Sequence, residues 1–508
     1  MVTVSDNWKA IQNDTLLPES FVELTYWITE PDAQGLATES NNGDLFYASS
    51  ETILDSSGFQ VWKYATLENN LWLLDGTCDI LPDEAPYGDT GYIADVEYPM
   101  VTIEFPEVRS QPIPGLTIVW SESFGEYATR CRITVLRGTE VLKSEEFLND
   151  SVRSVFHLPV SNYDRIYIEI IDWLIPDHRP RIERVYLGIR EVYTKSELLR
   201  YSHTQSVDLL STELPKNEIV FSLDNSSGLW NPDNPAGIAQ YLIDRQQVTV
   251  RYGYKINDNV EWIPGGTFWL SEWNTPSNGL EVSFTARDIL EFMDVKYTGP
   301  RSGTLYDIAT AAFRLVDLPK AENGVLRYSI DNSLKSISTD FSEDVNEYAV
   351  AVVLQMVANA GQCVMYQDRN GVFLIKKYAK VKSDYEINQD ISYTHPERTL
   401  TKPPHSVAIN GDMSVWSAQS GSGEAIEISN PIITQNSNAE LVRDWAVGIL
   451  QNRNLIHGTF RADPRLDVLD IITVESKYSK NFTAAVTEIK YEYNGAFRGE
   501  YVGREIEV

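Results

Sequence analysis

The sequence of 508 residues predicts a mainly β fold with a smaller α+β part. Segments that alternate apolar and polar residues recur along the chain, as half-buried strands of antiparallel sheets do. Short apolar stretches separated by turn residues follow one another between positions 101 and 188, a spacing typical of a β-sandwich. Three segments, all after residue 300, have the periodicity of an amphipathic helix.

The alternation is clearest at 217–225, 247–254, 279–287 and 481–493. Each segment places its apolar residues on one face, which we expect to be buried. These residues are Ile219, Phe221, Leu223, Val248, Val250, Tyr252, Tyr254, Leu280, Val282, Phe284, Ala286, Ile489, Tyr491 and Tyr493. A Pro-Gly-Gly break within 261–273 predicts a turn or a bulge beside another aromatic strand.

The composition changes in the first half of the chain. Residues 33–60 are rich in Ser, Asn, Asp and Gly, so loops are expected there. The sandwich strands expected after them are 101–105, 115–120, 130–136, 154–160, 163–171 and 181–188.

Helices are predicted over 302–317, 342–361 and 437–453 from their apolar spacing. Ser302 and Ser342 are the expected N-caps of the first two.

Two glycines mark expected chain reversals in the same region. Gly361 should end the second helix, and Asn370-Gly371 predicts the turn of a hairpin.

The segment 228–242, "GLWNPDNPAGIAQYL", is more rigid than a simple connection requires. Pro232 and Pro235 fix their own φ and restrict the asparagines before them. Trp230 and Leu229 supply apolar surface that can hold the turn in place. Two interpretations stay open: a stiff joint that a neighbouring molecule packs against, or a well-ordered surface loop.

Length and charge limit the class of protein. The chain is long enough for three or four cores, and 43% hydrophobic residues is an ordinary globular content. The longest apolar stretch, 348–361, is too short to span a membrane, and no signal peptide is visible, so we expect a soluble protein made in the cytoplasm. A net charge of −31 repels nucleic acid and acidic membranes.

Cysteine and histidine patterns give no sign of a metal site. Cys78, Cys131 and Cys363 are too few and too far apart for a disulfide framework or a zinc site, so we expect core thiols. The six histidines have no metal-ligand spacing, and no nucleophile elbow or phosphate-binding loop occurs.

Acidic clusters are the remaining candidates for chemistry. Residues 81–89 could be a solvated loop or a calcium site, although the spacing is not that of an EF-hand. Asp463, Asp467 and Asp470 could look catalytic, but their places at a turn and at a strand start favour a structural role. A dispersed acid pair of a glycosidase is left open.

Aromatic residues of the predicted sandwich could stack on sugars. Trp120, Tyr127, Tyr163 and Trp173 are available, but Trp120 and Trp173 end apolar strands and are better placed for the core. We therefore predict no catalytic, cofactor-binding or metal-binding residue, and we assign no carbohydrate-binding residue.

Several phrases in succession resemble tail proteins of phages and prophages of Gram-positive bacteria. They are "FVELTYWIT", "ATLENNLWLLDG", "GYIAD", "EWIPGGTFWLSEW", "FTARDILEFM", "HGTFRADPRLDVLDIITV" and "YNGAFRGEY", together with the segment 214–254. The succession is similar to the baseplate-hub or tail-tip family related to the hub of contractile tails. Residues 100–188 separately resemble a galactose-binding-like, discoidin-type jelly roll.

The resemblance implies an architecture of four domains. They are a first tail-tube-like β-barrel from 1–32 plus 190–300, an inserted jelly roll at 33–189, a helix and hairpin middle domain at 301–395, and a second tube-like β-barrel at 396–508.

The resemblance also implies a function and partners. The expected protein is a structural, non-enzymatic hub in the virion tail tip, without a cofactor, whose homotrimer joins the tail tube or distal tail protein to a spike or tail fibre. Its acidic surface would partly line a DNA channel, with no sequence-specific nucleic-acid binding and no membrane insertion. The alternatives are a host-surface adhesin that binds cell-wall carbohydrate through the jelly roll, and a glycan-degrading enzyme.

Overall fold

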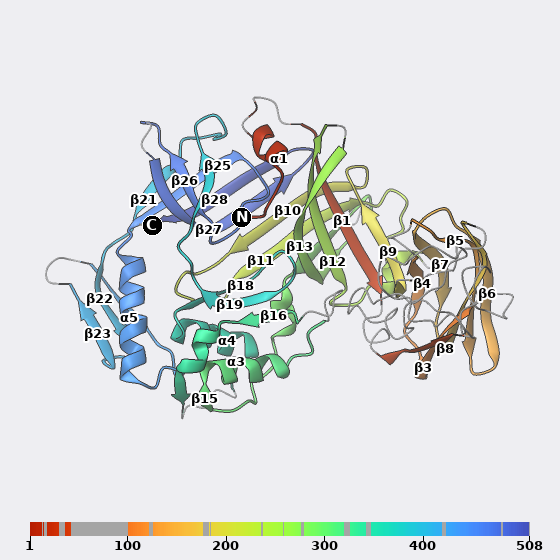
Figure 1. Cartoon of the computed structure of the whole chain (residues 1–508), viewed down its shortest axis with the longest axis horizontal. Helices are drawn as coiled ribbons and strands as arrows, with labels where there is room; N and C mark the ends of the chain where they lie inside the picture. Colours follow the sequence, from red (N-terminus) through yellow and green to blue (C-terminus); the bar gives the residue numbers. More distant parts are fainter. Residues whose placement is uncertain are drawn as a thin grey trace, which may run out of the picture.

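In a computed structural model of the chain, the described residues are 1–12, 14, 18–29, 36–41, 100–120, 125–175, 182, 184–234, 237–257, 259–275, 279–319, 326–341, 347–418, 423–478 and 481–506. They form several β-sheets and a few helices, so the predicted fold class, mainly β with a smaller α+β part, is confirmed. Figure 1 shows a β-sandwich on the right, two groups of long strands across the centre and top, and the longer helices below and to the left.

The β-sandwich has two antiparallel sheets that share one apolar core. One sheet has the order β2 (Thr38–Asn41), β3 (Met100–Arg109), β8 (Tyr163–Trp173), β5 (Ala128–Arg137) and β6 (Glu140–Leu148). The facing sheet contains β7 (Arg153–Val160), β4 (Ile113–Val119) and the first half of β9 (Arg184–Tyr193). All six predicted strands form, whereas β6 was missed because most of its side chains are polar and exposed.

The first barrel begins as an antiparallel ladder. Its order is β1 (Ser20–Thr29), β12 (Gln247–Ile256), β13 (Asn259–Asn274), β14 (Glu281–Arg287), β11 (Lys216–Asp224) and β10 (Leu198–Ser206). Segment 184–206 closes the ladder, because β9 pairs with β1 and, after a turn at 194–197, β10 pairs with β11 at the opposite edge. Large side chains fill the interior, among them Tyr26, Phe221, Tyr252, Tyr254 and Phe268.

The second barrel is closed in the same way. Its order is β20 (Lys382–Ile387), β26 (Ile471–Glu475), β27 (Asn481–Tyr493), β28 (Phe497–Glu505), β25 (Asn454–Arg461) and β21 (Glu397–Leu400). Segment 382–400 joins the two ends, because β20 pairs with β26 while Ser392 and β21 pair with β25.

The two barrels repeat one strand order. The order around the first ring is β11, β14, β13 and β12, and the corresponding order around the second is β25, β28, β27 and β26. In each ring, one bent segment closes the circle. The first barrel differs by the additional strand β1, which lies between β12 and the closing segment. The sandwich is inserted next to this additional strand, between β1 and β9.

Two long strands connect these units. The last residues of β27 pair with β10, so the barrels share a continuous ladder of backbone hydrogen bonds and one apolar core. The first half of β9 pairs with β4 of the sandwich and the second half with β1 of the first barrel. The path from β21 to β7 thereby includes 13 strands among the described residues, and β26 and β20 branch from it at β27 to complete a sheet of 15.

The α+β part packs below the barrels around a second apolar core. Its elements are η3 (Ile289–Phe292), β15 (Ser302–Thr304), α3 (Leu305–Arg314), β16 (Tyr328–Ile330), η4 (Asn332–Ser336), β17 (Ser338–Asp340), α4 (Val350–Ala360), β18 (Cys363–Gln367) and β19 (Phe373–Lys377). A lobe of β22 (Pro404–Ile409), β23 (Ser414–Ser417), β24 (Glu424–Ile428) and α5 (Asn436–Leu450) extends this core.

The three predicted helices form, but two of them begin later than expected. Ser302 lies in β15, and Thr304 is the N-cap of α3, in a capping box with Asp307. Ser342 lies outside the described residues, and α4 begins after Ala349, which has no side-chain cap. Before α3 the short strand β15 pairs with β17, and before α4 Ala349 forms a single bridge to Lys296, so neither Ser302 nor Ala349 is in a helical conformation.

Gly361 ends α4, and Asn370 and Gly371 lie in the turn between β18 and β19, as expected. The Pro-Gly-Gly break is a bulge, because the β12–β13 register shifts at Gly265 while β13 continues. The predicted core residues are buried with one exception, Leu280, which is exposed because it precedes β14 at the rim of the barrel.

The rigid segment at 228–242 packs against the first barrel through Trp230 and Tyr241. Trp230 is buried, and its ring stacks on Tyr26 at a centroid distance of 5.9 Å. The backbone forms successive turns in which the N–H of Gly228, Asn231, Asn234 and Gly237 each donates to the carbonyl three residues earlier. Leu229 does not help to hold the turn, since its side chain is exposed; Pro235 lies outside the described residues.

The α1 helix (Asp6–Ile11) places Trp8 between the barrels, where its ring meets Tyr254 edge-on and its Nε1–H donates to Asp463. We keep the four-domain division as a proposal. Its boundary after residue 189 lies inside β9, which belongs to both the sandwich and the first barrel.

A larger residue at Gly188 should break the connection between the sandwich and the first barrel. Gly188 has φ +139°, and a Cβ there would lie 2.2 Å from the Ile28 carbonyl oxygen, which is backbone and cannot rotate away. We expect Gly188→Ala to lower the free energy of unfolding by more than about 2 kcal/mol in denaturant titrations. Gly138→Ala, with φ +58° but open space around it, is the control and should lose about 1 kcal/mol.

Candidate functional site: the buried junction between the barrels

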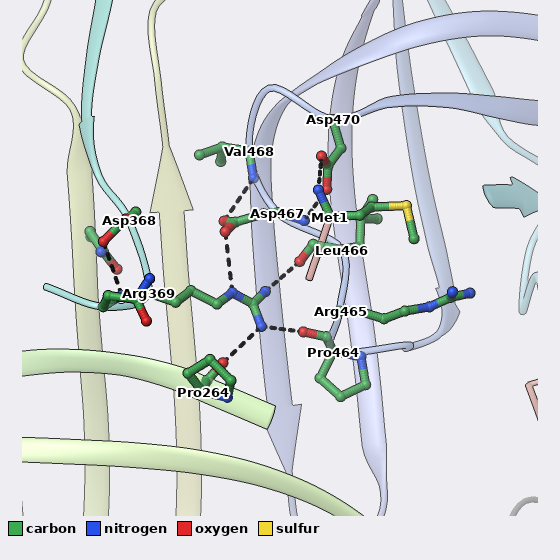
Figure 2. Close-up of polar contacts among 12 residues, drawn as sticks. Met1, Pro264, Asp368, Arg369, Pro464, Arg465, Leu466, Asp467, Val468 and Asp470 are labelled. Atoms are coloured by element: carbon green, nitrogen blue, oxygen red, sulfur yellow. Dashed lines mark hydrogen bonds and ion pairs between the residues drawn. The ribbon is translucent and has the colours of Figure 1, made fainter. Parts of the chain in front are cut away.

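The tip of the β18–β19 hairpin carries an arginine into the interior. The Asp368 carboxylate holds the turn, since its Oδ1 accepts from the backbone N–H of Asn370 at 2.9 Å and of Val372 at 3.0 Å. Gly371 has φ +75°, and a Cβ there would lie 3.0 Å from that of Thr267, so the turn requires glycine. The tight turn directs Arg369 between the two barrels (Figure 2).

The Arg369 guanidinium contacts both barrels. Its Nη1 donates to the Pro264 carbonyl of β13 at 3.3 Å and to the Pro464 carbonyl. Its Nη2 donates to the Leu466 carbonyl at 2.6 Å, and its Nε pairs with Asp467 at 3.2 Å. The side chain is 3% exposed, so these bonds replace its hydration.

This buried cation remains charged. Burial lowers the pKa of Arg369, but attraction to Asp467 and to the oxygens of Tyr491 and Tyr252 raises it, and the net direction is upward. The carbonyls come from the β13 bulge and from the connector 462–470 between β25 and β26. The arginine therefore holds two irregular backbone segments against each other.

A chain of buried polar side chains continues from this point into the first barrel. The hydroxyls of Tyr201 and Tyr252 are 2.6 Å apart, and the Tyr252 hydroxyl lies 2.8 Å from His203 Nδ1. His203 Nε2 lies 2.8 Å from Asn217 Oδ1, an oxygen that only accepts, so Nε2 donates and Nδ1 accepts from Tyr252. Burial lowers the pKa of His203 to about 4, and repulsion from Arg369 acts in the same direction.

The three aspartates of connector 462–470 have structural partners. Asp463 is fully buried and accepts from Trp8 Nε1 at 3.1 Å and from the Arg465 backbone and guanidinium. Asp467 pairs with Arg369, and Asp470 accepts from the Asp467 backbone N–H at 2.8 Å and from the Met1 amino group (Figure 2).

Burial raises the pKa of Asp463 and of Asp470. The sequence-based preference for a structural role of Asp463, Asp467 and Asp470 agrees with these contacts.

A second junction joins the first barrel to the α+β part at Asp288. Its Oδ1 accepts from the Leu290 backbone N–H at 3.0 Å, and its own N–H donates to the Asn217 carbonyl. Its Oδ2 is buried without a partner among the described residues. Burial raises the pKa of Asp288 to about 7.

The aromatic residues considered for sugar stacking are divided between core and edge. Trp120 and Tyr163 are buried, and Trp120 Nε1 donates to Ser154 Oγ at 2.7 Å. Trp173 is half-buried and donates to Glu126 at 2.8 Å, and Tyr127 is also half-buried.

Cys131 and Cys363 are buried free thiols, as expected, and burial raises the pKa of each to about 12; Cys78 and residues 81–89 lie outside the described residues. Over the part of the chain that the structure describes, no three His, Cys, Asp or Glu residues are grouped to hold a metal ion. Within the same part, none of the helices is long and apolar enough to cross a membrane.

Sequence reasoning missed Arg369 and His203. A charged residue in an Asp-x-Asn-Gly turn usually points to solvent, and nothing near position 369 in the sequence indicates the carbonyls that receive it. His203 lies on the buried face of β10, and a polar residue in that alternation was the one available signal.

Comparison with protein-family models and with curated proteins gives no match. Among solved structures, the 43 kDa tail protein of prophage MuSo2 from Shewanella oneidensis is 12% identical, with a TM-score of 0.44 over 62% of this chain and 95% of its own. A tail protein from Neisseria meningitidis MC58 is 10% identical, with a TM-score of 0.43 over 63% and 94%. Prophage tail protein gp18 from Listeria monocytogenes EGD-e is 10% identical, with a TM-score of 0.40 over 63% and 93%. Structural neighbours of the chain thus include prophage tail proteins, and each of these TM-scores is below 0.5.

Replacing Arg369 should weaken the contact between the barrels. Arg369→Met leaves the Asp467 carboxylate and three carbonyls without their donor, and we expect a loss of about 3–5 kcal/mol in the free energy of unfolding. Arg369→Lys keeps the charge but has fewer hydrogen-bond donors. Its free energy of unfolding should therefore lie between those of Arg369→Met and the wild type. Arg314→Met, at an exposed position of α3, is the control and should stay within about 0.5 kcal/mol in the same urea titration.

The Asp288 carboxyl should make stability depend on pH. Because its folded pKa is raised from 3.8 to about 7, its stabilising contribution is complete below about pH 4 and is lost as the pH rises through 7. Asp288→Asn stays neutral, so its free energy of unfolding relative to wild type should rise by a few kcal/mol between pH 5 and pH 8. A difference that stays constant over this range would contradict the assignment; Asp317→Asn, at an exposed position, is the control.

Proposed function

We propose that this chain is a structural, non-enzymatic hub of the tail tip or baseplate of a phage or phage-like particle. The observation that carries the proposal is the presence of two barrels with the same strand order, held side by side by the β10–β27 ladder and by Arg369. Three such chains would present six barrels around one axis. That arrangement would match a six-fold tail tube above and a three-fold spike or fibre below.

Large side chains fill the interiors of both barrels. A channel would therefore run between chains and not through a barrel. Tyr252, Tyr254, Tyr491, Phe221 and Phe268 are fully buried inside the barrels. DNA would therefore pass along the axis of the assembled ring. The net charge of −31 supports a channel surface that repels phosphates, and no sequence-specific contact with nucleic acid is proposed.

The proposed partners follow from this position in the particle. One face of the homotrimer would meet the tail tube or the distal tail protein, and the other a spike or tail-fibre protein. The chain would be made in the bacterial host cytoplasm and end in the virion. The sandwich, inserted beside β1, would project from the ring as a jelly roll without disturbing the barrels.

Carbohydrate binding by the sandwich remains the alternative function. Of the aromatic residues considered for it, Trp120 and Tyr163 serve the core, so only Tyr127 and Trp173 have partly exposed rings. A glycan array with the full chain separates the two functions, since a hub without adhesion would bind no cell-wall sugar.

The proposed trimer can be tested by measuring the mass of the assembly. We expect native mass spectrometry and light scattering of the full chain to give three times the mass of one chain. Electron microscopy of the same sample should show rings with an open axis. A monomer at high micromolar concentration, with no ring in the particle, would contradict the proposed function.

A further inference from the structure

Three large apolar side chains are exposed at one end of the first barrel. They are Leu229 (42% exposed), Trp273 (37%) and Leu280 (60%), and we call them the corner patch. Their two segments are tied together by Asn225, whose side chain accepts from the Trp230 N–H at 2.9 Å and donates to the Gly279 carbonyl at 2.9 Å.

Backbone bonds make the corner patch rigid. The successive turns from Gly228 to Gly237 fix Leu229, and Thr275 Oγ1 donates to the Trp230 carbonyl at 3.2 Å. Little conformational entropy would be lost when another surface covers this patch.

The charged residues around the corner patch are mostly acidic. Segments 197–200, 224–234 and 272–281 contain five carboxylates and one guanidinium. The carboxylates are Glu197, Asp224, Asp233, Glu272 and Glu281, and the guanidinium is Arg200. Asp224 and Glu281 are direct cross-strand neighbours that Arg200, 3.9 Å from Glu281, compensates only in part, so a further cation from outside would relieve their repulsion.

A second apolar surface lies on the second barrel, at the β21 end of the 13-strand path. Tyr393 (55% exposed) precedes β21 and Leu400 (62%) is its last residue, and we call this surface the edge patch. All four residues of β21 are exposed, and among the described strands only β25 pairs with it. An open, partly apolar strand edge of this kind favours contact with another chain.

The edge patch is basic, although the chain as a whole is acidic. Segment 393–405 contains Arg398, Lys402 and two histidines, and the carboxylates beside them are Glu397 and Glu505, the latter 3.6 Å from Arg398. Arg453 adds a further cation, because its Nε donates to the Thr401 carbonyl at 2.9 Å. The corner patch and the edge patch thus combine exposed apolar side chains with opposite charges.

The two patches cannot meet within one chain. The edge patch is at the left of the molecule in Figure 1, and the sandwich is at the right. The corner segment lies on the side of the sandwich, since its η2 helix (Ile238–Tyr241) contacts β4.

We propose that the corner patch of one chain binds the edge patch of a second copy of the same chain. The contact is heterologous, because two different surfaces meet, and such contacts generate a ring when the rotation between copies closes. This inference rests on the proposed function, which sets the number of copies at three. It names the surfaces through which the ring forms.

Introducing a charged residue into the apolar centre of each patch provides the test. Leu229→Glu should disable the corner patch and Leu400→Glu the edge patch, and each full-length variant alone should be monomeric at concentrations at least about tenfold above those that assemble wild type. Val141→Glu is the control, since Val141 is similarly exposed on β6 of the sandwich and belongs to neither patch. Circular dichroism of each variant would establish that the fold is retained.

Mixing the two variants distinguishes this contact from any other. Leu229→Glu keeps an intact edge patch and Leu400→Glu an intact corner patch, so one contact can form but no third chain can add. We expect a 1:1 heterodimer in native mass spectrometry. Separately, Lys402→Glu should weaken the ring and Glu272→Lys in the same chain should restore it.

The outcomes separate this inference from the proposed function. A wild-type trimer that persists in both leucine variants would overturn the inference and leave the proposed hub intact, because other surfaces would then hold the ring. A mixture without heterodimers would also overturn it. A wild-type chain that stays monomeric would instead contradict the proposed function, and this inference with it.

Discussion

The arrangement of the barrels depends on the burial of one positive charge. The Arg369 guanidinium has lost its hydration and receives carbonyl oxygens from the β13 bulge and the 462–470 connector, together with the Asp467 carboxylate. The Pro464 and Leu466 carbonyls lie outside the strands and the Pro264 carbonyl lies next to the β13 bulge, so these buried groups need a donor. The arginine supplies the donors, and the irregular segments of both barrels supply the acceptors that make its burial tolerable.

Continuous backbone reinforces this junction. The β10–β27 ladder carries hydrogen bonds from one barrel to the other, and β9 carries them on to the sandwich. Bending between separately folded units usually occurs where few contacts cross, and here strands and a shared core cross instead. A rigid pair of barrels is suited to a component that must keep its neighbours in register.

Much of the secondary structure could be predicted, and the errors have local causes. Alternation located the strands at 217–225 and 247–254, and Asn370-Gly371 located the hairpin turn. Ser302 was wrong as a cap because it lies in the short strand β15, and α4 begins after Ala349 instead of after Ser342. Alternation placed Leu280 in the core although it lies at the barrel rim. The candidate site was only half predicted: the three aspartates of the connector were recognised, and their cation was not.

The sequence by itself determined which segments are strands, which faces are apolar and where the chain turns, because these properties depend on spacings of a few residues. Only the tertiary structure decided that segments 184–206 and 382–400 each pair with both edges of a ladder. It also decided that a turn arginine is buried and that the corner and edge patches stay exposed on opposite flanks. These properties depend on residues that lie outside one local stretch of sequence, such as Arg369 and Pro264, which no local pattern relates to each other.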